Sequence, residues 1–438
     1  MAHALARPLK PLRVAVVGAG WAGIAAAVHA RLAGHCVQVF EMAPQPGGRA
    51  RSVCAGGLTL DNGQHILIGA YTATLELMRM VGADPRALLQ CLPLALQYPD
   101  GQGLRLPGGA PMPAFARAVL SRQGWGWSAR WSLLARAARW ALGGFHAAPT
   151  LSVAQLCAGL PPIVQRQLVE PLCVAALNTP AAQASAEVFL RVMRDALLGG
   201  PGSSDLLLPK AALDALLPEP ATDWFSAHGV RLLTGTRVAQ LQRGAAGWRV
   251  DGSGFDAVVL ACSAAEAARL CSAVAPDWAG CAAALHYEPI VTVYLSSPGV
   301  RLPLPMLALE AGDDAPAQFV FDLGALGRAE GVLAFVISGA SAWVDRGLQA
   351  TAEATLAQAR QALGAERWRV PPSLLHVGAE KRATFRCTPA LRRPPRDIAP
   401  GLLAAGDYVA GPYPATLEGA VRSGREAAAA VSRLAAAG

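Results

Sequence analysis

Apolar residues near the start of the chain form two short runs separated by a longer helical pattern. Val14 to Val17 is uninterrupted and rich in β-branched side chains, which predicts a buried parallel strand. Ala22 to Leu32 predicts a helix that ends near Gly34, and Val37 to Phe40 predicts a second strand. This strand–helix–strand order predicts a parallel α/β unit.

The pattern changes twice further along the chain. Residues 57–69 predict two short strands that flank a turn at Asp61-Asn62-Gly63, and residues 71–205 predict mostly helices. Strand patterns then return, and a helix is predicted near 347–363. The last strand precedes a loop and a final helix that reaches about Leu434. The predicted strands lie at Val230–Leu233, Arg237–Leu241, Trp248–Asp251, Ala257–Leu260, Ile290–Leu295, Gln318–Phe321 and Val332–Ile337.

One predicted helix, GWGWSARWSLLARAARWALGGF, is rich in both tryptophan and arginine. Two interpretations fit it. A core helix with solvated arginines is favoured slightly over an interfacial helix that rests on a bilayer, where Trp and Arg are common. Helical spacing places one set of large and small apolar residues on a single face: Trp127, Trp131, Leu134, Ala138 and Phe145.

Composition narrows the class of protein. The 438 residues are enough for about two to three domains. No apolar run reaches the ~18 residues of a membrane span, and the basic N-terminus leads directly into the first strand, so no secretory signal is expected. Nine scattered cysteines without a C-x-x-C pair predict reduced thiols in a cytoplasmic protein, and neither disulfides nor a metal site.

Charge and hydropathy point away from nucleic acid. The chain is 53% hydrophobic and 16% charged, with a formal net charge of +8. No base-stacking aromatic motif occurs among basic residues, so no nucleic-acid partner is expected. An oily, basic chain favours an apolar ligand or an anionic membrane surface.

The first turn carries the pattern G-x-G-x-x-G at Gly18, Gly20 and Gly23. These glycines permit a tight turn, close approach of the backbone to a pyrophosphate, and close packing of helix on strand. Trp21 and Ala22 open the helix, whose N-terminal amides favour phosphate charge. Together these residues predict a dinucleotide site.

The second predicted strand delivers Glu41, eighteen residues after Gly23. A carboxylate there can accept hydrogen bonds from both ribose hydroxyls, and it would repel a 2′-phosphate. NADP is therefore disfavoured at this site.

The segment Pro46-Gly47-Gly48-Arg49-Ala50 resembles the G-G-R segment of the flavin amine oxidase and phytoene desaturase superfamily. The resemblance implies that Gly48 and Arg49 take further charge off the pyrophosphate of FAD. A glycine turn with a guanidinium supplies such donors.

The closing segment, LLAAGDYVAGPYPATLEGAVRS, extends the same resemblance. It implies that Asp407, after Gly406, binds the ribityl or pyrophosphate region of FAD. It also implies that backbone amides near Leu417, Glu418 and Ala420 face the pyrimidine edge of the flavin, and that the backbone of Val238 contacts the adenine. A helix N-terminus there would stabilise reduced flavin. No lysine or cysteine indicates covalent attachment, so noncovalent FAD is expected.

The fold class that follows is α/β, with a Rossmann-type FAD-binding domain that is discontinuous in sequence. We expect residues 1–70, 206–264 and 396–438 to form this domain. Residues 71–205 and 265–395 are expected to form a substrate-binding domain of mixed sheet and helices.

Three segments resemble one branch more closely, the hydroxysqualene dehydroxylases: LDNGQHILIGAY, VEPLCVAALNTP and AGDYVAGPYPATLEGAVRSG. The branch typically has tryptophan where Tyr408 stands here. The resemblance implies that reduced FAD converts hydroxysqualene, an apolar isoprenoid, to squalene and water. It further implies Gln64 and His65 beside the flavin, a peripheral membrane habit, and upstream prenyl synthases as partners.

Two residues are candidate proton donors for such a reaction. His65 is the first, because its usual pKa suits proton transfer near neutrality; the alternative of equal weight is that it only braces its turn by hydrogen bonding. Glu170 is the second, since an apolar neighbourhood would raise its pKa. Cys173 is expected to be a core thiol.

Three other functions stay open. An oxidative desaturase of a carotenoid-like polyene would use the same flavin architecture. An amine oxidase would need an aromatic pair at the closing loop, where this chain has Tyr408 and Tyr413. A flavin-binding scaffold that passes substrate between prenyl synthases would bind FAD without turnover.

Overall fold

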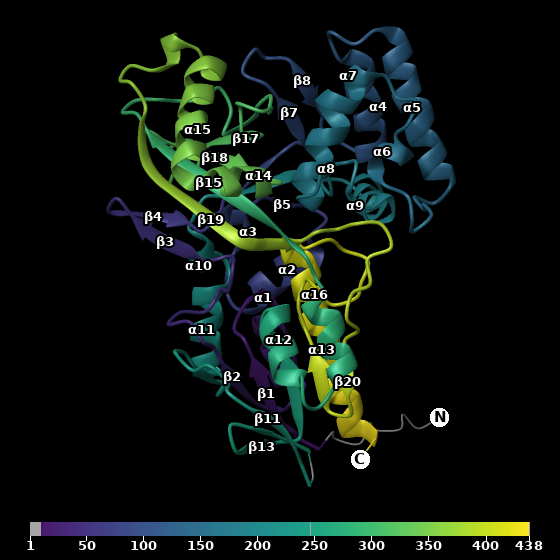
Figure 1. Ribbon diagram of the computed structural model, residues 1–438, viewed down its shortest axis with the longest axis vertical. Helices are drawn as coiled ribbons and strands as arrows, with labels where there is room; N and C mark the ends of the chain where they lie inside the picture. Colours follow the sequence, from purple (N-terminus) through teal and green to yellow (C-terminus); the bar gives the residue numbers. More distant parts are fainter. Residues whose placement is uncertain (1–9, 246, 438) are drawn as a thin grey trace.

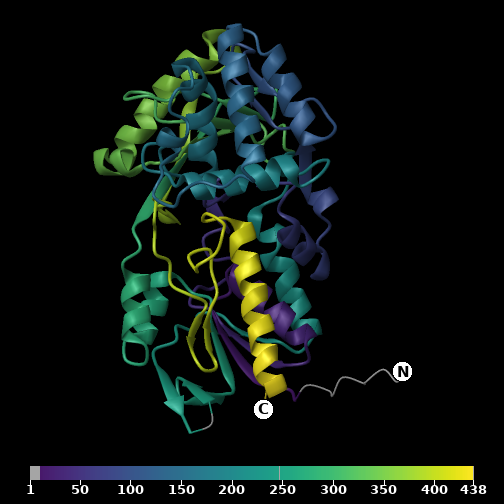
Figure 2. The same cartoon turned by 90° about the vertical axis from the view of Figure 1, so that its right-hand side faces the viewer.

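The computed structural model describes residues 10–245 and 247–437, so residues 1–9 of the basic N-terminal segment lie outside it. The molecule is elongated, with a parallel sheet and its helices in the lower half and an antiparallel sheet beside a cluster of helices in the upper half (Figures 1 and 2). The long strand β19 (Ser373–Phe385) runs along the boundary between the halves.

The lower half is built on a six-stranded sheet in the order β10-β2-β1-β14-β21-β20. All neighbouring pairs are parallel except β20–β21. The central strand β1 is apolar and buried because helices cover the sheet. This is the expected Rossmann-type α/β arrangement. Its strands are β1 (Arg13–Val17), β2 (Cys36–Phe40), β10 (Arg231–Leu233), β14 (Ala257–Leu260), β20 (Asp397–Ala399) and β21 (Leu402–Ala404).

The first and last helices of the chain, α1 (Trp21–Leu32) and α16 (Leu417–Ala437), pack against each other on this sheet. A Cβ at Gly424 would lie 2.1 Å from the carbonyl oxygen of Ala22, so only glycine allows this approach. The other elements of the lower half are α10 (Leu213–Leu216), α11 (Pro218–Ala227), β11 (Leu241–Gly244), β12 (Gly247–Val250), β13 (Ser253–Phe255), α12 (Ala264–Cys271) and α13 (Pro276–Ala283).

One predicted strand, Arg237–Leu241, is wrong. The strand begins only at Leu241, because the backbone amides of Ala239 and Gln240 donate to the carboxylate of Asp251 instead of to a neighbouring strand. In addition, α12 and α13 lie beside the parallel sheet, although most of their residues fall in the segment assigned to the substrate domain. The domain boundaries stay a prediction.

The upper half contains a five-stranded antiparallel sheet in the order β16-β17-β18-β15-β19. One central strand is a continuous, buried apolar run, Val332–Ile337, whereas the edge strand β19 also carries charged residues, and α15 packs against the sheet. The bounds are β15 (Tyr287–Ser296), β16 (Met306–Ala308), β17 (Phe319–Asp322), β18 (Val332–Ile337), α14 (Ser341–Arg346), α15 (Leu348–Leu363) and the short 3₁₀ turn Ala365–Arg367.

Residues 72–209 are mostly helical, as predicted, with a π-helical turn at Gln165–Val169. Small strands join them to the rest of the fold. The elements are α2 (Thr72–Met80), α3 (Pro85–Leu88), β6 (Leu89–Leu92), β7 (Ala95–Gln97), β8 (Gly103–Arg105), α4 (Pro111–Ser121), α5 (Trp127–Leu142), α6 (Val153–Leu156), α7 (Pro162–Val164), α8 (Glu170–Leu177), α9 (Ala186–Leu198) and β9 (Leu206–Pro209).

The two strands predicted within residues 57–69 exist but do not pair with each other. The strand β4 (Leu58–Asp61) forms a hairpin with β3 (Ser52–Ala55), and its turn is at Gly56 and Gly57, which both have positive φ. The second strand, β5 (Leu67–Ile68), pairs with β9. Residues 62–66 therefore form an irregular connection between the two strands.

The favoured core interpretation of the tryptophan-rich helix is wrong for Trp127 and Trp131, whereas Trp125, just before the helix, is buried and Trp140 packs against the core. Helix α5 buries Ala129, Leu133 and Ala137, whereas Trp127 and Trp131 are 63% and 59% exposed. The helix has two apolar stripes, and the smaller side chains pack inward because they allow close contact with its neighbours.

A buried ion pair joins the upper half to β4. The guanidinium of Arg328 and the carboxylate of Asp61 are 6% and 0% exposed, respectively. The Asp61 carboxylate also accepts a hydrogen bond from the backbone amide of Leu213 at 3.0 Å, and the Asp61 carbonyl accepts one from the Tyr294 hydroxyl at 2.8 Å. The last residue of β4 is therefore fixed from three directions.

Substituting Arg328→Met should destabilise the protein by about 3–5 kcal/mol, because the Asp61 carboxylate would remain buried without its cation. Thermal and denaturant unfolding should both report the loss. The exposed pair Arg396–Asp397 provides the control, since Arg396→Met should cost less than about 1 kcal/mol. Equal stability of the two variants would contradict the prediction.

Candidate active site

One cavity of about 500 Å³ lies between the two halves and gathers most of the predicted cofactor residues. They come from the first turn, the second glycine turn, the 62–66 connection and the closing segment. The predicted residues that line it are Gly18, Gly20, Trp21, Ala22, Glu41, Gly48, Arg49, Gln64, His65, Val238, Gly406, Asp407, Leu417 and Ala420. Gly23 and Glu418 are not among the lining residues.

The two glycine turns lie side by side and form a cradle without side chains. The amide of Gly47 donates to the Ala19 carbonyl at 2.9 Å, and a Cβ at Gly48 would lie 3.2 Å from the Cα of Gly20. Gly18 has φ +107°, and a Cβ at Gly23 would lie 1.9 Å from the Gly18 carbonyl oxygen. The third glycine thus serves packing, and the first two leave backbone open to a pyrophosphate.

The carboxylate of Glu41 is held at the end of β2 by two backbone amides. Ala19 donates to Oε2 at 2.6 Å, and Ala43 donates to Oε1 at 2.8 Å. Each carboxylate oxygen can accept more than one hydrogen bond, so the group is fixed in place yet still able to accept from ribose hydroxyls.

The two ends of the cofactor motif meet in an ion pair. The guanidinium of Arg49 lies 2.6 Å from the carboxylate of Asp407, and it also donates to the carbonyls of Arg382 and Ala383. The pair joins the second glycine turn to the closing segment. The contacts of Arg49 and Asp407 with pyrophosphate and ribityl chain stay predictions.

Gln64 supplies the test of fit for a flavin. In the described part of the chain, neither its Oε1 nor its Nε2 has a hydrogen-bond partner, and both atoms are buried. Leaving such a group unpaired costs roughly 1–3 kcal/mol. The cavity it lines suits a ligand that offers both donors and acceptors, as the pyrimidine ring of a flavin does.

The prediction for Glu418 concerns its backbone amide, which is expected to face the flavin. Its side chain has a structural role. The buried carboxylate accepts hydrogen bonds from the amides of Ala73 and Thr74, from the Thr74 hydroxyl and from Arg422. It therefore caps the N-terminus of α2 and fixes the start of α16.

The sequence matches the family model of flavin-containing amine oxidoreductases over residues 21–432. It is 32% identical to a hydroxysqualene dehydroxylase from Rhodopseudomonas palustris, an alignment that covers 95% of this chain and 97% of the relative. The chain belongs to the hydroxysqualene dehydroxylase branch of the flavin-containing amine oxidoreductases.

Two further comparisons, one of structure and one of sequence, show what else this chain is similar to. An oxidoreductase from Methanosarcina mazei shares the fold with a TM-score of 0.73 and 16% identity, over 95% of this chain and 99% of that chain. A probable zeta-carotene desaturase from Synechococcus elongatus is 42% identical, but over only 23% of this chain and 22% of the relative. The cofactor of this dehydroxylase family member is FAD.

Of the two candidate proton donors, only His65 lines the cavity. Its Nδ1 lies 2.7 Å from the carbonyl oxygen of Gly63, which leaves Nε2 for a ligand. Burial is the main cause that lowers the pKa of His65 below 6.5, so the neutral ring is favoured.

Glu170, the second candidate, lies outside the cavity lining. Its carboxylate accepts from the amide of Ala181 at 3.3 Å, and burial raises its pKa. Whether either residue donates a proton stays a prediction.

The aromatic pair that an amine oxidase would require does not form at the closing loop. Tyr408 lines the cavity and is buried. The hydroxyl of Tyr413 instead donates to Asp195 at 2.9 Å and accepts from Arg191 at 3.0 Å, both on α9. This arrangement does not favour an amine oxidase.

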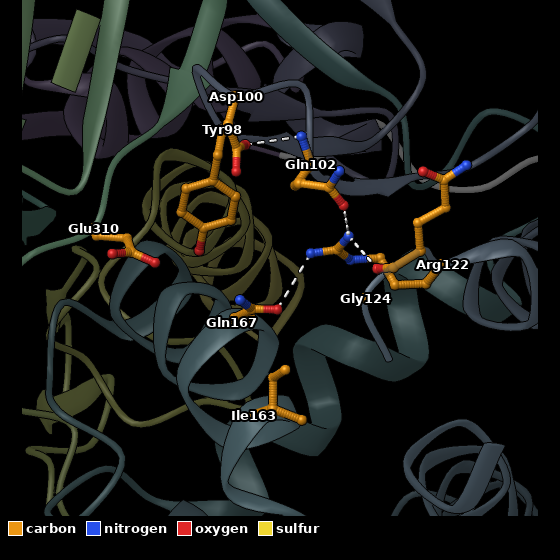
Figure 3. A pocket seen from close by; sticks show the side chains of 9 residues that line it. Tyr98, Asp100, Gln102, Arg122, Gly124, Ile163, Gln167 and Glu310 are labelled. Atoms are coloured by element: carbon orange, nitrogen blue, oxygen red, sulfur yellow. Dashed lines mark hydrogen bonds between the residues drawn. The ribbon is translucent and has the colours of Figure 1, made fainter. Parts of the chain in front are cut away.

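A second, smaller pocket of about 350 Å³ lies in the upper half and shares no lining residue with the cofactor cavity (Figure 3). Its central group is Arg122, which donates to Gln102 at 2.9 Å and Gln167 at 3.2 Å. Gln167 belongs to the π-helical turn and also accepts from the indole of Trp125 at 2.9 Å. The pocket joins the β7–β8 turn to the loop before α5.

Arg393 is a site residue that the sequence analysis missed. Its guanidinium packs on the ring of Phe385, 4.5 Å from the centroid. It donates to five carbonyls of the closing loop, those of Asp407, Tyr408, Val409, Gly411 and Tyr413. One arginine among several in a Pro-rich segment gave no signal of this role, which depends on the folded loop.

Replacing Arg393 with methionine should weaken FAD binding at least about 10-fold, because five carbonyls lose a buried donor and the loop with Asp407 loosens. Fluorescence titration of the apoprotein with FAD measures the affinity. The neighbouring, exposed Arg392→Met serves as the matched control. Equal FAD affinity of both variants, with both folded by circular dichroism, would contradict the role.

Proposed function

We propose that this protein catalyses the FAD-dependent reductive dehydroxylation of hydroxysqualene to squalene and water. The observation that carries the proposal is the similarity to a hydroxysqualene dehydroxylase over nearly the full length of both chains. The similarity to carotene desaturases is confined to about a quarter of the chain and supports only the shared family.

The cavity suits such a substrate. Beyond the cofactor cradle its wall is formed by apolar side chains of three strands, among them Ile290, Phe319, Phe321 and Val336. Burying a hydrocarbon chain against such a wall is favourable by about 25 cal/mol per Å². The same wall excludes water from the reacting carbon, so that water does not compete with the hydride.

Loss of the allylic hydroxyl as water leaves a delocalised cation, and reduced FAD, when bound, supplies the hydride that quenches it. His65 is the proposed proton donor to the leaving oxygen, because it lines the cavity and the bond from Nδ1–H to the Gly63 carbonyl leaves Nε2 for the substrate. In the neutral ring Nε2 carries no proton, so the ring first takes one up from solvent there, and its lowered pKa makes the resulting imidazolium a stronger acid.

The test is a single-turnover reaction with protein reduced anaerobically. Adding hydroxysqualene should reoxidise the flavin with one squalene formed per flavin, followed by absorbance and mass spectrometry. Unchanged substrate with reduced flavin would contradict the proposal. Oxidised protein with a carotenoid-like polyene then tests the desaturase, and bound FAD without any turnover would indicate the scaffold.

Two variants of the same reaction separate the proton donors. His65→Gln should slow flavin reoxidation by about 10²-fold or more, the usual worth of a general acid. Glu170→Gln tests the second candidate. A larger loss in the Glu170 variant than in the His65 variant would reassign the donor.

We also propose that α5 rests on an anionic membrane surface. Trp127, Trp131 and Leu142 are exposed on this helix, Leu142 by 91%, and α5 lies at the outer edge of the upper half (Figure 1). The guanidinium of Arg130 stacks 4.8 Å from the Trp127 ring. No helix of the described residues is long and apolar enough to span a bilayer, and an interfacial helix suits an apolar substrate delivered by prenyl synthases.

Flotation with liposomes that contain anionic lipid tests this surface. The Trp127→Ser, Trp131→Ser double variant should lose most of its bound fraction, because two interfacial aromatic anchors are removed. Leu32→Ser, which removes an exposed leucine from the lower half, is the control and should bind like the unmodified protein. Equal flotation of all three proteins would contradict the proposal.

A further inference from the structure

The cavity is lined by a carboxylate that is neither a predicted cofactor residue nor a candidate proton donor. Glu380 lies on β19 and lines the cavity. It pairs across the sheet with Ile290 of β15, and directly paired residues present their side chains on the same face. Ile290 also lines the cavity, so Glu380 stands at the border between the apolar wall and the cofactor cradle.

Two neutral donors hold this carboxylate. The side-chain amide of Asn62 donates to Oε2 at 3.1 Å, and the backbone amide of Arg382 donates to Oε1 at 3.1 Å. Asn62 also donates to the carbonyl of Arg49. Because Asn62 belongs to the same connection as Gln64 and His65, Glu380 is fixed relative to both.

The sheet face that carries Glu380 presses on this connection. Tyr294 of the same strand as Ile290 donates to the carbonyl of Asp61, and Thr292 lies against Gly63, where a Cβ would be 3.8 Å from its hydroxyl oxygen. Residues two apart on a strand share a face. The position of Glu380 beside the connection is therefore set by packing as well as by its hydrogen bonds.

Among the described residues, no Lys, Arg or His nitrogen lies within 4.0 Å of the Glu380 carboxylate, so it forms no direct ion pair. Its charge is nevertheless one of those that raise the pKa of Arg49. The guanidinium of Arg49 is engaged by Asp407, and Arg382, which also lines the cavity, is exposed. A fixed carboxylate beside an apolar wall stabilises a positive charge in the cavity far more than it would in water.

We propose that Glu380 is a catalytic residue whose carboxylate stabilises the allylic cation; this rests on the proposed function. The C–O bond breaks with its electron pair on oxygen, and one solvent proton, taken up by His65 and passed on, completes the leaving water. Reduced FAD would supply the hydride for the new C–H bond, so that the substrate carbon would be reduced by two electrons and FAD oxidised. Glu380 remains a carboxylate throughout.

The test uses FAD-loaded, oxidised protein and two probes that need no turnover. One is a tertiary ammonium analogue with nitrogen in place of the carbinol carbon of hydroxysqualene, and the other is squalene. Glu380→Gln should weaken binding of the ammonium probe at least about 10-fold, while squalene affinity stays within about twofold, both followed by flavin absorbance. Glu353→Gln, an exposed carboxylate on α15, is the matched control and should change neither affinity.

The same variant should slow flavin reoxidation by hydroxysqualene by about 10²-fold or more. Equal binding of the ammonium probe by Glu380→Gln and unmodified protein would overturn the proposal. If Glu380→Gln does not retain FAD, Asn62→Ser, which removes one of the two donors, should reduce the preference for the ammonium probe, and an unchanged preference would overturn it.

Two outcomes separate this inference from the proposed function. The protein could bind the ammonium probe selectively, in a manner that depends on Glu380, and still leave hydroxysqualene intact. That result would support the cation site and would exclude hydroxysqualene as the substrate. Anaerobic bleaching of the oxidised flavin by the ammonium probe would indicate amine oxidation, and it would overturn the assignment of Glu380 to an allylic cation.

Discussion

The buried carboxylate of Asp61 sets the position of the whole site. This carboxylate is paired with Arg328 and accepts a hydrogen bond from the backbone amide of Leu213. The backbone carbonyl of Asp61 accepts one from the hydroxyl of Tyr294. These partners come from both halves of the molecule, so the end of β4 cannot move without breaking several buried contacts. The irregular connection that follows carries Gln64 and His65, which line the cavity, and an irregular backbone needs such an anchor because it lacks a strand partner.

The cofactor end and the substrate end of the cavity obey different physical rules. The cofactor end is built on two glycine turns whose backbone is free of side chains, together with the charged groups of Glu41, Arg49 and Asp407. The substrate end is made of apolar strand residues that offer no donors to water. A polar cofactor and a hydrocarbon can therefore share one cavity, with Gln64, His65 and Glu380 at the border between them.

The parts of the site that the sequence predicts are those with local physical causes. The turn from Gly18 to Gly23, the strand that delivers Glu41 and the helix that starts at Leu417 follow from spacing and pattern over short stretches. The strand predicted at Arg237–Leu241 failed because the carboxylate of Asp251 takes the backbone donors, which no periodicity reveals.

Roles that depend on contacts between residues far apart in the chain could not be predicted from the sequence. Glu380 and Arg393 acquire theirs only when β19 pairs with β15 and when the closing loop wraps around a guanidinium. Helix α5 has two apolar stripes. The stripe with smaller side chains is the buried one, and hydrophobic periodicity alone does not distinguish the two. Periodicity identifies a helix, but not its orientation when both faces are apolar.

The ion pair between Arg49 and Asp407 joins residues 358 positions apart. During synthesis at roughly 5–20 residues per second, the glycine turns therefore leave the ribosome many seconds before the closing segment exists. For that interval the nascent chain lacks the segment that supplies Asp407, Leu417 and Ala420 to the cavity. Completion of the flavin site is consequently a late event in the synthesis of the chain.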